Sequence, residues 1–233
     1  MPDTRTDTNR YRRVLSSILV TGLLCASLAP MSGCAIAGLV SVMARTWEQT
    51  GSSRISAEYD ELSDKTFAVV VFADRGIEGV HPRLATRVSE RATLRLANVA
   101  NTNASGFVPA RFVLEFQLTT PSWTSWTYDQ LLEEFGVDRL IVIEISEFLL
   151  NEPGNQYIWD GRAVARVGVV EAGSALPDDF TYSKDIRVTY PDGRGFTQND
   201  LSRDQVYGYL ENRMLDRITW LFYEHEEANA IKY

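Results

Sequence analysis

The segment LLEEFGVDRLIVIEISEF, residues 131–148, changes its hydrophobic pattern halfway along. Its first part continues a helical pattern that begins at Tyr128, and Gly136 stands where a residue that ends a helix is expected. The uninterrupted apolar run Leu140–Ile143 then fits a strand that is buried on both faces of a sheet. A helix that leads directly into such a strand predicts an α/β domain, with helices packed on a central sheet.

Four other segments have the patterns of strands. FAVVVFAD, Phe67–Asp74, is a second apolar run that fits a strand buried on both faces. Apolar and polar residues alternate in Arg162–Val170 and Thr181–Tyr190, which predicts strands covered on one face. A short strand is expected at Phe107–Val108, and the residues after it fit either a short helix or more strand. The sequence therefore predicts a single domain with a mixed β-sheet of about five strands.

Helical spacing of apolar residues predicts two more helices. One begins at Pro82, which suits a first helical turn, and continues to Val99. The other begins at Ser202, where Gln205 three residues later completes a capping-box pattern, and continues to about Glu226. The segment DRGIEGV, before the first of these helices, is expected to be a glycine-containing loop.

The amino terminus has the order of a secretory signal. Arg10, Arg12 and Arg13 form a positive cluster, and no charged residue occurs from Val14 to Ala44. A positive region, an apolar region and then small residues are typical of an export signal.

The tetrapeptide MSGC, Met31–Cys34, follows that apolar region and resembles the lipobox of bacterial lipoproteins. The resemblance implies that Cys34 is linked to diacylglycerol and becomes the first residue of the mature chain. Cys25 does not fit, because two leucines precede it where small residues are needed. Two alternatives stay open: an uncleaved membrane anchor, and a soluble secreted protein cleaved near Ala29 or Gly33.

These features divide the chain into a lipoprotein signal peptide (1–33), a lipidated tether (34–64) and a periplasmic α/β domain (65–233). We expect the protein in the cell envelope, attached to a membrane through its lipid. Ala35, rather than aspartate, follows the cysteine and resembles an outer-membrane sorting signal, so the outer membrane is favoured over the inner. The formal charge of −8 argues against a nucleic-acid partner, which would require clustered Lys and Arg.

The order of elements resembles the periplasmic α/β domain shared by the TolB amino-terminal domain, the curli-secretion lipoprotein CsgG and the LpoB-type activators of peptidoglycan synthases. Three segments carry the resemblance: FAVVVFAD, LATRVSERATLRLAN and the helix–Gly-Val-Asp–strand unit of residues 131–148. The resemblance implies a binding or accessory role in envelope assembly or transport, with an envelope protein as partner. A membrane pore is not expected, because the strands within 162–190 carry charges instead of a lipid-facing apolar band.

Sequence motifs for catalysis are absent from the chain: it has no GxSxG, GxxxxGK[ST] or GxGxxG. No cofactor and no metal site are expected. The acidic residues around His225 are adjacent on a predicted helix, so they point in different directions. The alternative to a binding protein is a membrane-tethered periplasmic enzyme, with Asp74, Glu144 and Glu147 forming a carboxylate site at the strand ends.

Three aromatic residues, Trp123, Trp126 and Tyr128, occur close together between serines and threonines. Aromatic side chains that are exposed in a loop usually contact a partner, whereas buried ones cover a hydrophobic core. We therefore choose these three residues as the candidate binding surface, with core covering as the alternative interpretation.

We predict that Cys34→Ala abolishes metabolic labelling of the chain with palmitate, because the substitution removes the thiol that accepts the lipid. Cys25→Ala is the matched control and should leave labelling unchanged. Labelling of the Cys34→Ala chain at the wild-type level would contradict the lipoprotein assignment.

Overall fold

The computed structural model describes residues 51–175 and 178–228. Cys34, the predicted signal peptide and residues 34–50 of the predicted tether lie outside the described residues, so these assignments stay predictions.

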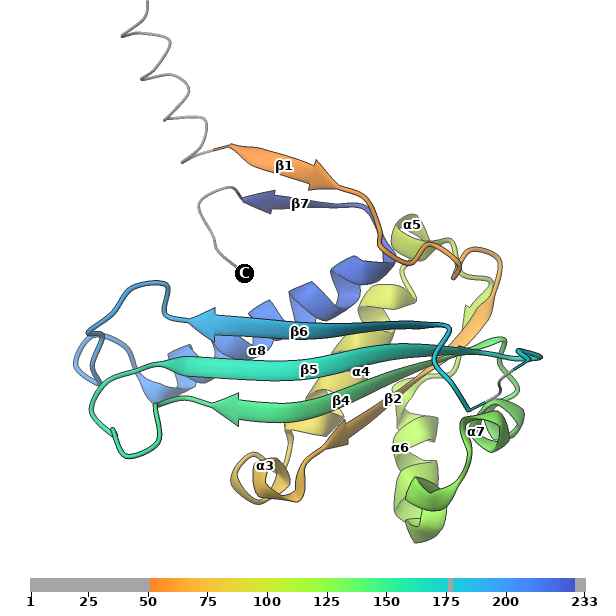
Figure 1. Ribbon diagram of the computed structural model, residues 1–233, viewed down its shortest axis with the longest axis horizontal. Helices are drawn as coiled ribbons and strands as arrows, with labels where there is room; N and C mark the ends of the chain where they lie inside the picture. Colours follow the sequence, from red (N-terminus) through yellow and green to blue (C-terminus); the bar gives the residue numbers. More distant parts are fainter. Residues whose placement is uncertain (1–50, 176–177, 229–233) are drawn as a thin grey trace, which may run out of the picture. The chain divides into compact units, whose positions relative to one another are not determined.

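The described chain contains both strands and helices (Figure 1). The strands are β1 Ser52–Ile55, β2 Thr66–Ala73, β3 Gly106–Phe107, β4 Arg139–Leu149, β5 Gly161–Glu171, β6 Tyr182–Tyr190 and β7 His225–Ala228. The α-helices are α3 Arg75–Val80, α4 Leu84–Leu96, α5 Val99–Thr102, α6 Ala110–Thr119, α7 Tyr128–Phe135 and α8 Arg203–Thr219. Two 3-10 helices are also present, η1 Pro121–Ser125 and η2 Trp220–Phe222.

Five strands form one mixed sheet in the order β3-β2-β4-β5-β6, and β1 pairs with β7 in a separate two-stranded sheet. β2 is parallel to both β3 and β4. The β4–β5 and β5–β6 pairs are antiparallel. The predicted fold class, an α/β domain with a mixed sheet of about five strands, is confirmed.

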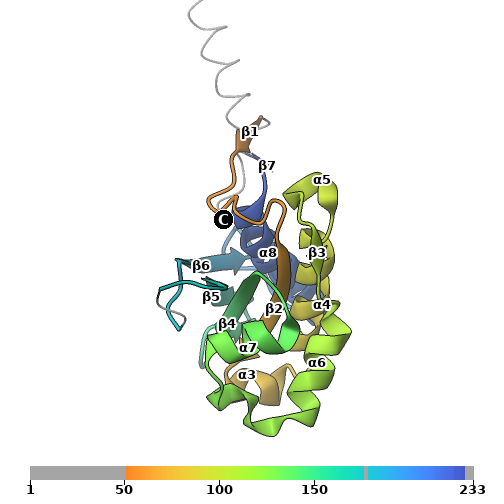
Figure 2. The same ribbon diagram turned by 90° about the vertical axis from the view of Figure 1, so that its right-hand side faces the viewer.

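Different helices cover the two faces of this sheet, because side chains alternate along each strand. Phe67, Val69 and Val71 of β2 belong to a core with α4 and α8, whereas Ala68 and Val70 belong to a second core with α6 and α7. In Figure 2, α6 and α7 lie beside β2 and β4 and away from β6. Burial on both faces explains why β2 and β4 are continuous apolar runs in the sequence.

The connection from α7 to β4 determines how β4 pairs with β2. Gly136 ends α7 in the left-handed conformation, with a φ of 60°, as the sequence predicted. Two residues later, Asp138 Oδ2 accepts hydrogen bonds from both the backbone N and the Oγ1 of Thr66, each at 2.8 Å. The backbone N of Asp138 in turn donates to the Thr66 carbonyl oxygen at 3.1 Å. These bonds join the beginnings of the two parallel strands, where Phe67 pairs with Arg139.

Arg139, the first residue of β4, connects the segment before β2 to the main sheet. Its buried Nε donates to the Tyr59 hydroxyl at 2.9 Å, and its guanidinium lies 3.2 Å from Glu171 on β5. Burial is the main cause that raises the pKa of Tyr59. Tyr59 and Leu62 are both buried in the core, and β1 lies ahead of them. Residues 52–64 of the predicted tether thus contain a strand and core side chains.

A buried ion pair joins the two helices on one face of the sheet. Glu211 of α8 has no exposed surface, and its carboxylate lies 2.8 Å from guanidinium nitrogens of both Arg87 and Arg91 of α4. A charge in this position is stable only with its partners present, because desolvation of an unpaired carboxylate is costly. The pair therefore favours one alignment of α4 against α8.

The structure differs from the prediction in two elements that follow β2. DRGIEGV was expected to be a loop, but Arg75–Val80 form the short helix α3, and Asp74 Oδ1 caps it by accepting from Gly76 N at 3.4 Å. α4 begins at Leu84 and ends at Leu96, inside the predicted 82–99. Thr102 Oγ1 donates to the Leu96 carbonyl oxygen at 2.7 Å, which satisfies a backbone group at the end of the helix.

The ambiguous segment after the short strand is helical, since Ala110–Thr119 form α6. The short strand itself, Gly106–Phe107, begins one residue earlier than predicted.

The last helix is shorter than predicted. α8 begins after its capping box at Ser202 as expected, but it ends at Thr219 instead of about Glu226. His225–Ala228 form β7, which pairs with β1 in the two-stranded sheet. The His225 ring stacks on Trp220, with ring centroids 4.5 Å apart. The backbone is extended from Tyr223, so the helix does not continue, and His225 reaches the Trp220 ring from the extended chain.

We predict that Asp138→Ala lowers the free energy of unfolding by about 2 kcal/mol, because it removes the charge-assisted bonds to Thr66. Those bonds hold the pKa of Asp138 below its ordinary value. Their contribution should therefore be complete above about pH 4 and lost as pH falls through the lowered pKa. Urea unfolding of both chains at several pH values measures this difference. A difference that stays constant from neutral to acidic pH would contradict it.

Candidate functional site

The three aromatic residues chosen from the sequence line one hollow of about 370 Å³. Trp123 lies in η1, Trp126 follows it, and Tyr128 is the first residue of α7. Thr127 between them caps α7 in a full capping box with Gln130, which fixes where the loop ends and the helix begins. All three aromatic side chains are half-buried.

Each of these rings packs against another aromatic ring from a different element. The ring centroids of Trp123 and Phe72 lie 4.6 Å apart. Those of Trp126 and Phe116 lie 5.2 Å apart, as do those of Tyr128 and Phe180. The rings also contact the core between the sheet and α6–α7. They therefore cover the core and line the hollow, so the two interpretations drawn from the sequence are compatible.

Two carboxylates lie in the wall of this hollow. Glu144 reaches it from β4, and Asp178 from the chain before β6. Asp178 Oδ1 accepts a hydrogen bond from the backbone N of Tyr128 at 3.0 Å. Burial raises the pKa of the Tyr128 hydroxyl, and the charges of Glu144 and Asp178 raise it further. The hollow thus combines aromatic walls with negative charge.

Sequence reasoning missed several of these lining residues. Phe72 belongs to an apolar run that fits an ordinary buried strand, and no sequence motif marks Asp178. Asp178 lies fifty positions after Tyr128, so no local spacing links the two. Glu144 was considered, but as part of a different site.

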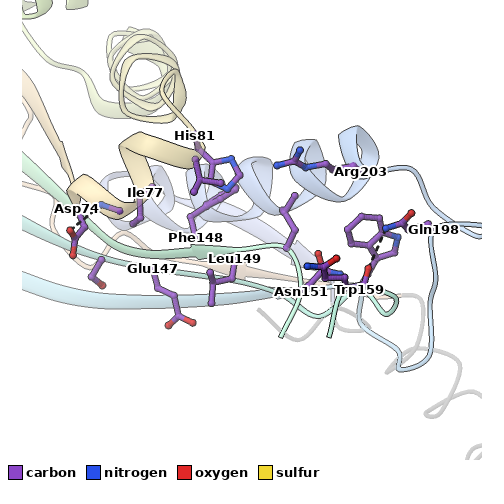
Figure 3. A pocket seen from close by; sticks show the side chains of 15 residues that line it. Asp74, Ile77, His81, Glu147, Phe148, Leu149, Asn151, Trp159, Gln198 and Arg203 are labelled. Carbon is purple, nitrogen blue, oxygen red and sulfur yellow. Dashed lines mark hydrogen bonds between the residues drawn. The ribbon is translucent and has the colours of Figure 1, made fainter. Parts of the chain in front are cut away.

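A second, larger cavity of about 710 Å³ lies at the carboxyl ends of β2 and β4 (Figure 3). Asp74 and Glu147 line it together with His81 and Arg203. Asp74 is engaged in capping α3, and Glu147 lies 3.5 Å from Arg162. In Figure 3 the Glu147 carboxylate points away from His81 and Arg203.

The structure does not bring the predicted carboxylate site together. Asp74 and Glu147 line the larger cavity, whereas Glu144 lines the aromatic hollow instead. A bulge in β4 between Ile145 and Glu147 shifts the pairing with β5 at this point. Within 51–175 and 178–228, no three His, Cys, Asp or Glu side chains are grouped so that they could bind a metal ion. No helix in the same ranges is both long and apolar enough to cross a bilayer.

His81 is the main titratable group of the larger cavity. Its side chain is buried beside Phe148 and Tyr207, with ring centroids 5.1 and 5.3 Å away. Burial lowers the pKa of His81, and the positive charge of Arg203 lowers it further. Both effects favour the neutral form of the imidazole.

Comparison with known proteins gives structural matches alone. No family model matches the chain, and no curated protein matches it. The matched structures include a PelC dodecamer from Paraburkholderia phytofirmans, at 9% identity over 74% of this chain and 98% of that one, with a TM-score of 0.41. Lipoprotein GNA1162 from Neisseria meningitidis matches at 14% identity over 66% of this chain and 96% of that one, with a TM-score of 0.41.

The LpoB C-terminal domain from Salmonella enterica also matches, at 11% identity over 62% of this chain and 90% of that one, with a TM-score of 0.34. The resemblance named from the sequence included the LpoB-type proteins, and the matched structures include one of them.

We predict that Arg203→Gln raises the pKa of His81, because one of the two causes that lower it is removed. The pKa should stay below its ordinary value, since burial of the ring remains. The chain has two histidines, so an NMR pH titration of their ring protons resolves the change. Arg162→Gln is the control and should leave the pKa of His81 unchanged, whereas an equal effect of both variants would contradict the assignment.

Proposed function

We propose that the protein is a lipid-anchored envelope protein that acts by binding, as an accessory module in envelope assembly or transport. In this proposal Cys34 carries the lipid, the α/β domain faces the periplasm, and the aromatic hollow contacts a partner protein. The localisation follows from the secretory signal and the lipobox resemblance, and an outer-membrane location from Ala35.

The single observation that carries the binding role is the arrangement of Trp123, Trp126 and Tyr128. Their rings pack against those of Phe72, Phe116 and Phe180, which restricts their positions. Rigid aromatic side chains that line a hollow are the usual anchors of protein interfaces, because they contribute a large contact area with little loss of side-chain freedom.

An enzyme acting through Asp74, Glu144 and Glu147 is less well supported. These carboxylates line two different hollows, and two of them already have structural partners. Acid–base catalysis or cation binding by the three together would need them to face one point.

A photo-crosslinking amino acid at Thr124 tests this function. Thr124 is exposed and lines the hollow, so a bound partner would lie within reach of the probe. We expect a defined protein adduct when the chain is irradiated in intact envelopes. Trp126→Ser in the same chain should remove that adduct.

Position Glu90 is the matched control for this experiment. It is exposed on α4, which covers the opposite face of the sheet. The same adduct from both positions, or an adduct that survives Trp126→Ser, would contradict the proposed binding site. Absence of any adduct from position 124 would count against a partner protein at this hollow.

A further inference from the structure

The aromatic hollow carries more negative charge than an apolar contact site requires. Phe72, Trp123, Trp126 and Tyr128 contribute ring surface, while Glu144 and Asp178 contribute carboxylates. No Lys or Arg of the described chain lines this hollow. A ligand that binds here therefore meets ring faces and negative charge together.

Arg166 is a cation on the strand beside Glu144, and it does not line the aromatic hollow. It lies opposite Glu144 in the pairing of β4 with β5. Its Nε donates to Asp185 Oδ1 on β6 at 2.9 Å. Arg166 lines a neighbouring hollow over β4–β6, which it shares with Glu144. Asp185 and Glu144 therefore share the charge of Arg166, and the guanidinium stays outside the aromatic hollow.

The second carboxylate, that of Asp178, is positioned by a hydrogen bond to α7. Asp178 Oδ1 accepts from the backbone N of Tyr128, the first residue of α7. This bond fixes a negative charge beside the Tyr128 ring. The two carboxylates come from β4 and from the chain before β6, and the aromatic rings lie with them around the hollow.

Ring faces and carboxylates are complementary to an arginine side chain. A guanidinium stacks on aromatic faces, where it is attracted by the negative face of the ring, and it also donates to carboxylates in fixed directions. Its three methylene groups can lie against the apolar part of the wall. An acidic side chain would be repelled, and a purely apolar one would remove water from the two carboxylates without supplying a positive charge.

We propose that this hollow binds an arginine side chain of the partner protein. The inference rests on the proposed function, and it adds the chemistry of the partner: a basic segment that places one arginine between Trp123, Trp126 and Glu144. The formal charge of −8 on the whole chain acts in the same direction, because it attracts a basic partner from a distance.

Fluorine NMR of the full chain, labelled with 5-fluorotryptophan and held in non-ionic detergent, tests the inference. The chain has five tryptophans, and Trp→Phe variants assign their resonances. The probe is the peptide acetyl-Gly-Arg-Gly-amide. We expect it to shift the resonances of Trp123 and Trp126 and to leave those of Trp159 and Trp220 in place.

Two matched comparisons test the role of the charge. A peptide with citrulline in place of arginine has the same shape without the charge, and it should bind about tenfold more weakly. Glu144→Gln should weaken binding of the arginine peptide about fivefold to tenfold. Glu147→Gln, a carboxylate on the same strand that lines the other cavity, should leave the affinity unchanged.

Equal affinity of the two peptides, or no shift of Trp123 and Trp126 with either, would overturn the inference. Ethanolamine that binds as well as the arginine peptide would also overturn it, because a lipid amine would then be the better occupant. The proposed function fails separately. If position 124 gives an adduct but the arginine and citrulline peptides bind equally, the partner site stands and the arginine inference is wrong. If the arginine peptide binds but position 124 gives no adduct, the proposal of a partner protein is wrong.

Discussion

The hydrogen bonds between Asp138 and Thr66 connect the two strands on which the rest of the sheet depends. They fix the register of β4 against β2 at the first residue pair, so every later pair along both strands follows. Because side chains alternate, a shift of one residue would turn each core residue of β4 to the other face. The α4–α8 core and the α6–α7 core therefore both depend on this one contact between short polar groups.

The same register places the candidate site. Phe72 stands opposite Glu144 in the β2–β4 pair, so a ring and a carboxylate reach the same face of the sheet. α7 continues through Gly136 into β4, which brings Tyr128 and the tryptophans before it over that face. A rigid sheet with an aromatic loop above it suits a binding surface better than a catalytic centre, since the carboxylates are spread along the sheet.

Some elements were predicted from the sequence more accurately than others, and the reasons are physical. α7 and its glycine end were predicted to the residue, because capping and backbone preference act within a few neighbours. The carboxyl-terminal helix was predicted too long, because β7 forms only through pairing with β1, far away in the chain. Residues 52–64 were assigned to the tether, although Tyr59 and Leu62 are buried, because two core residues among polar ones produce no periodic pattern.

The sequence by itself determined the class of the fold, the position of most elements, the lipobox resemblance at Cys34 and the aromatic spacing at Trp123, Trp126 and Tyr128. These features depend on composition, periodicity and short motifs. Only the tertiary structure decided that Glu144 joins the aromatic hollow while Asp74 and Glu147 line another cavity. Strand order, a β-bulge and distant loops decide which cavity each of these side chains lines. Such contacts depend on pairing across the sheet, which produces no pattern among neighbouring residues.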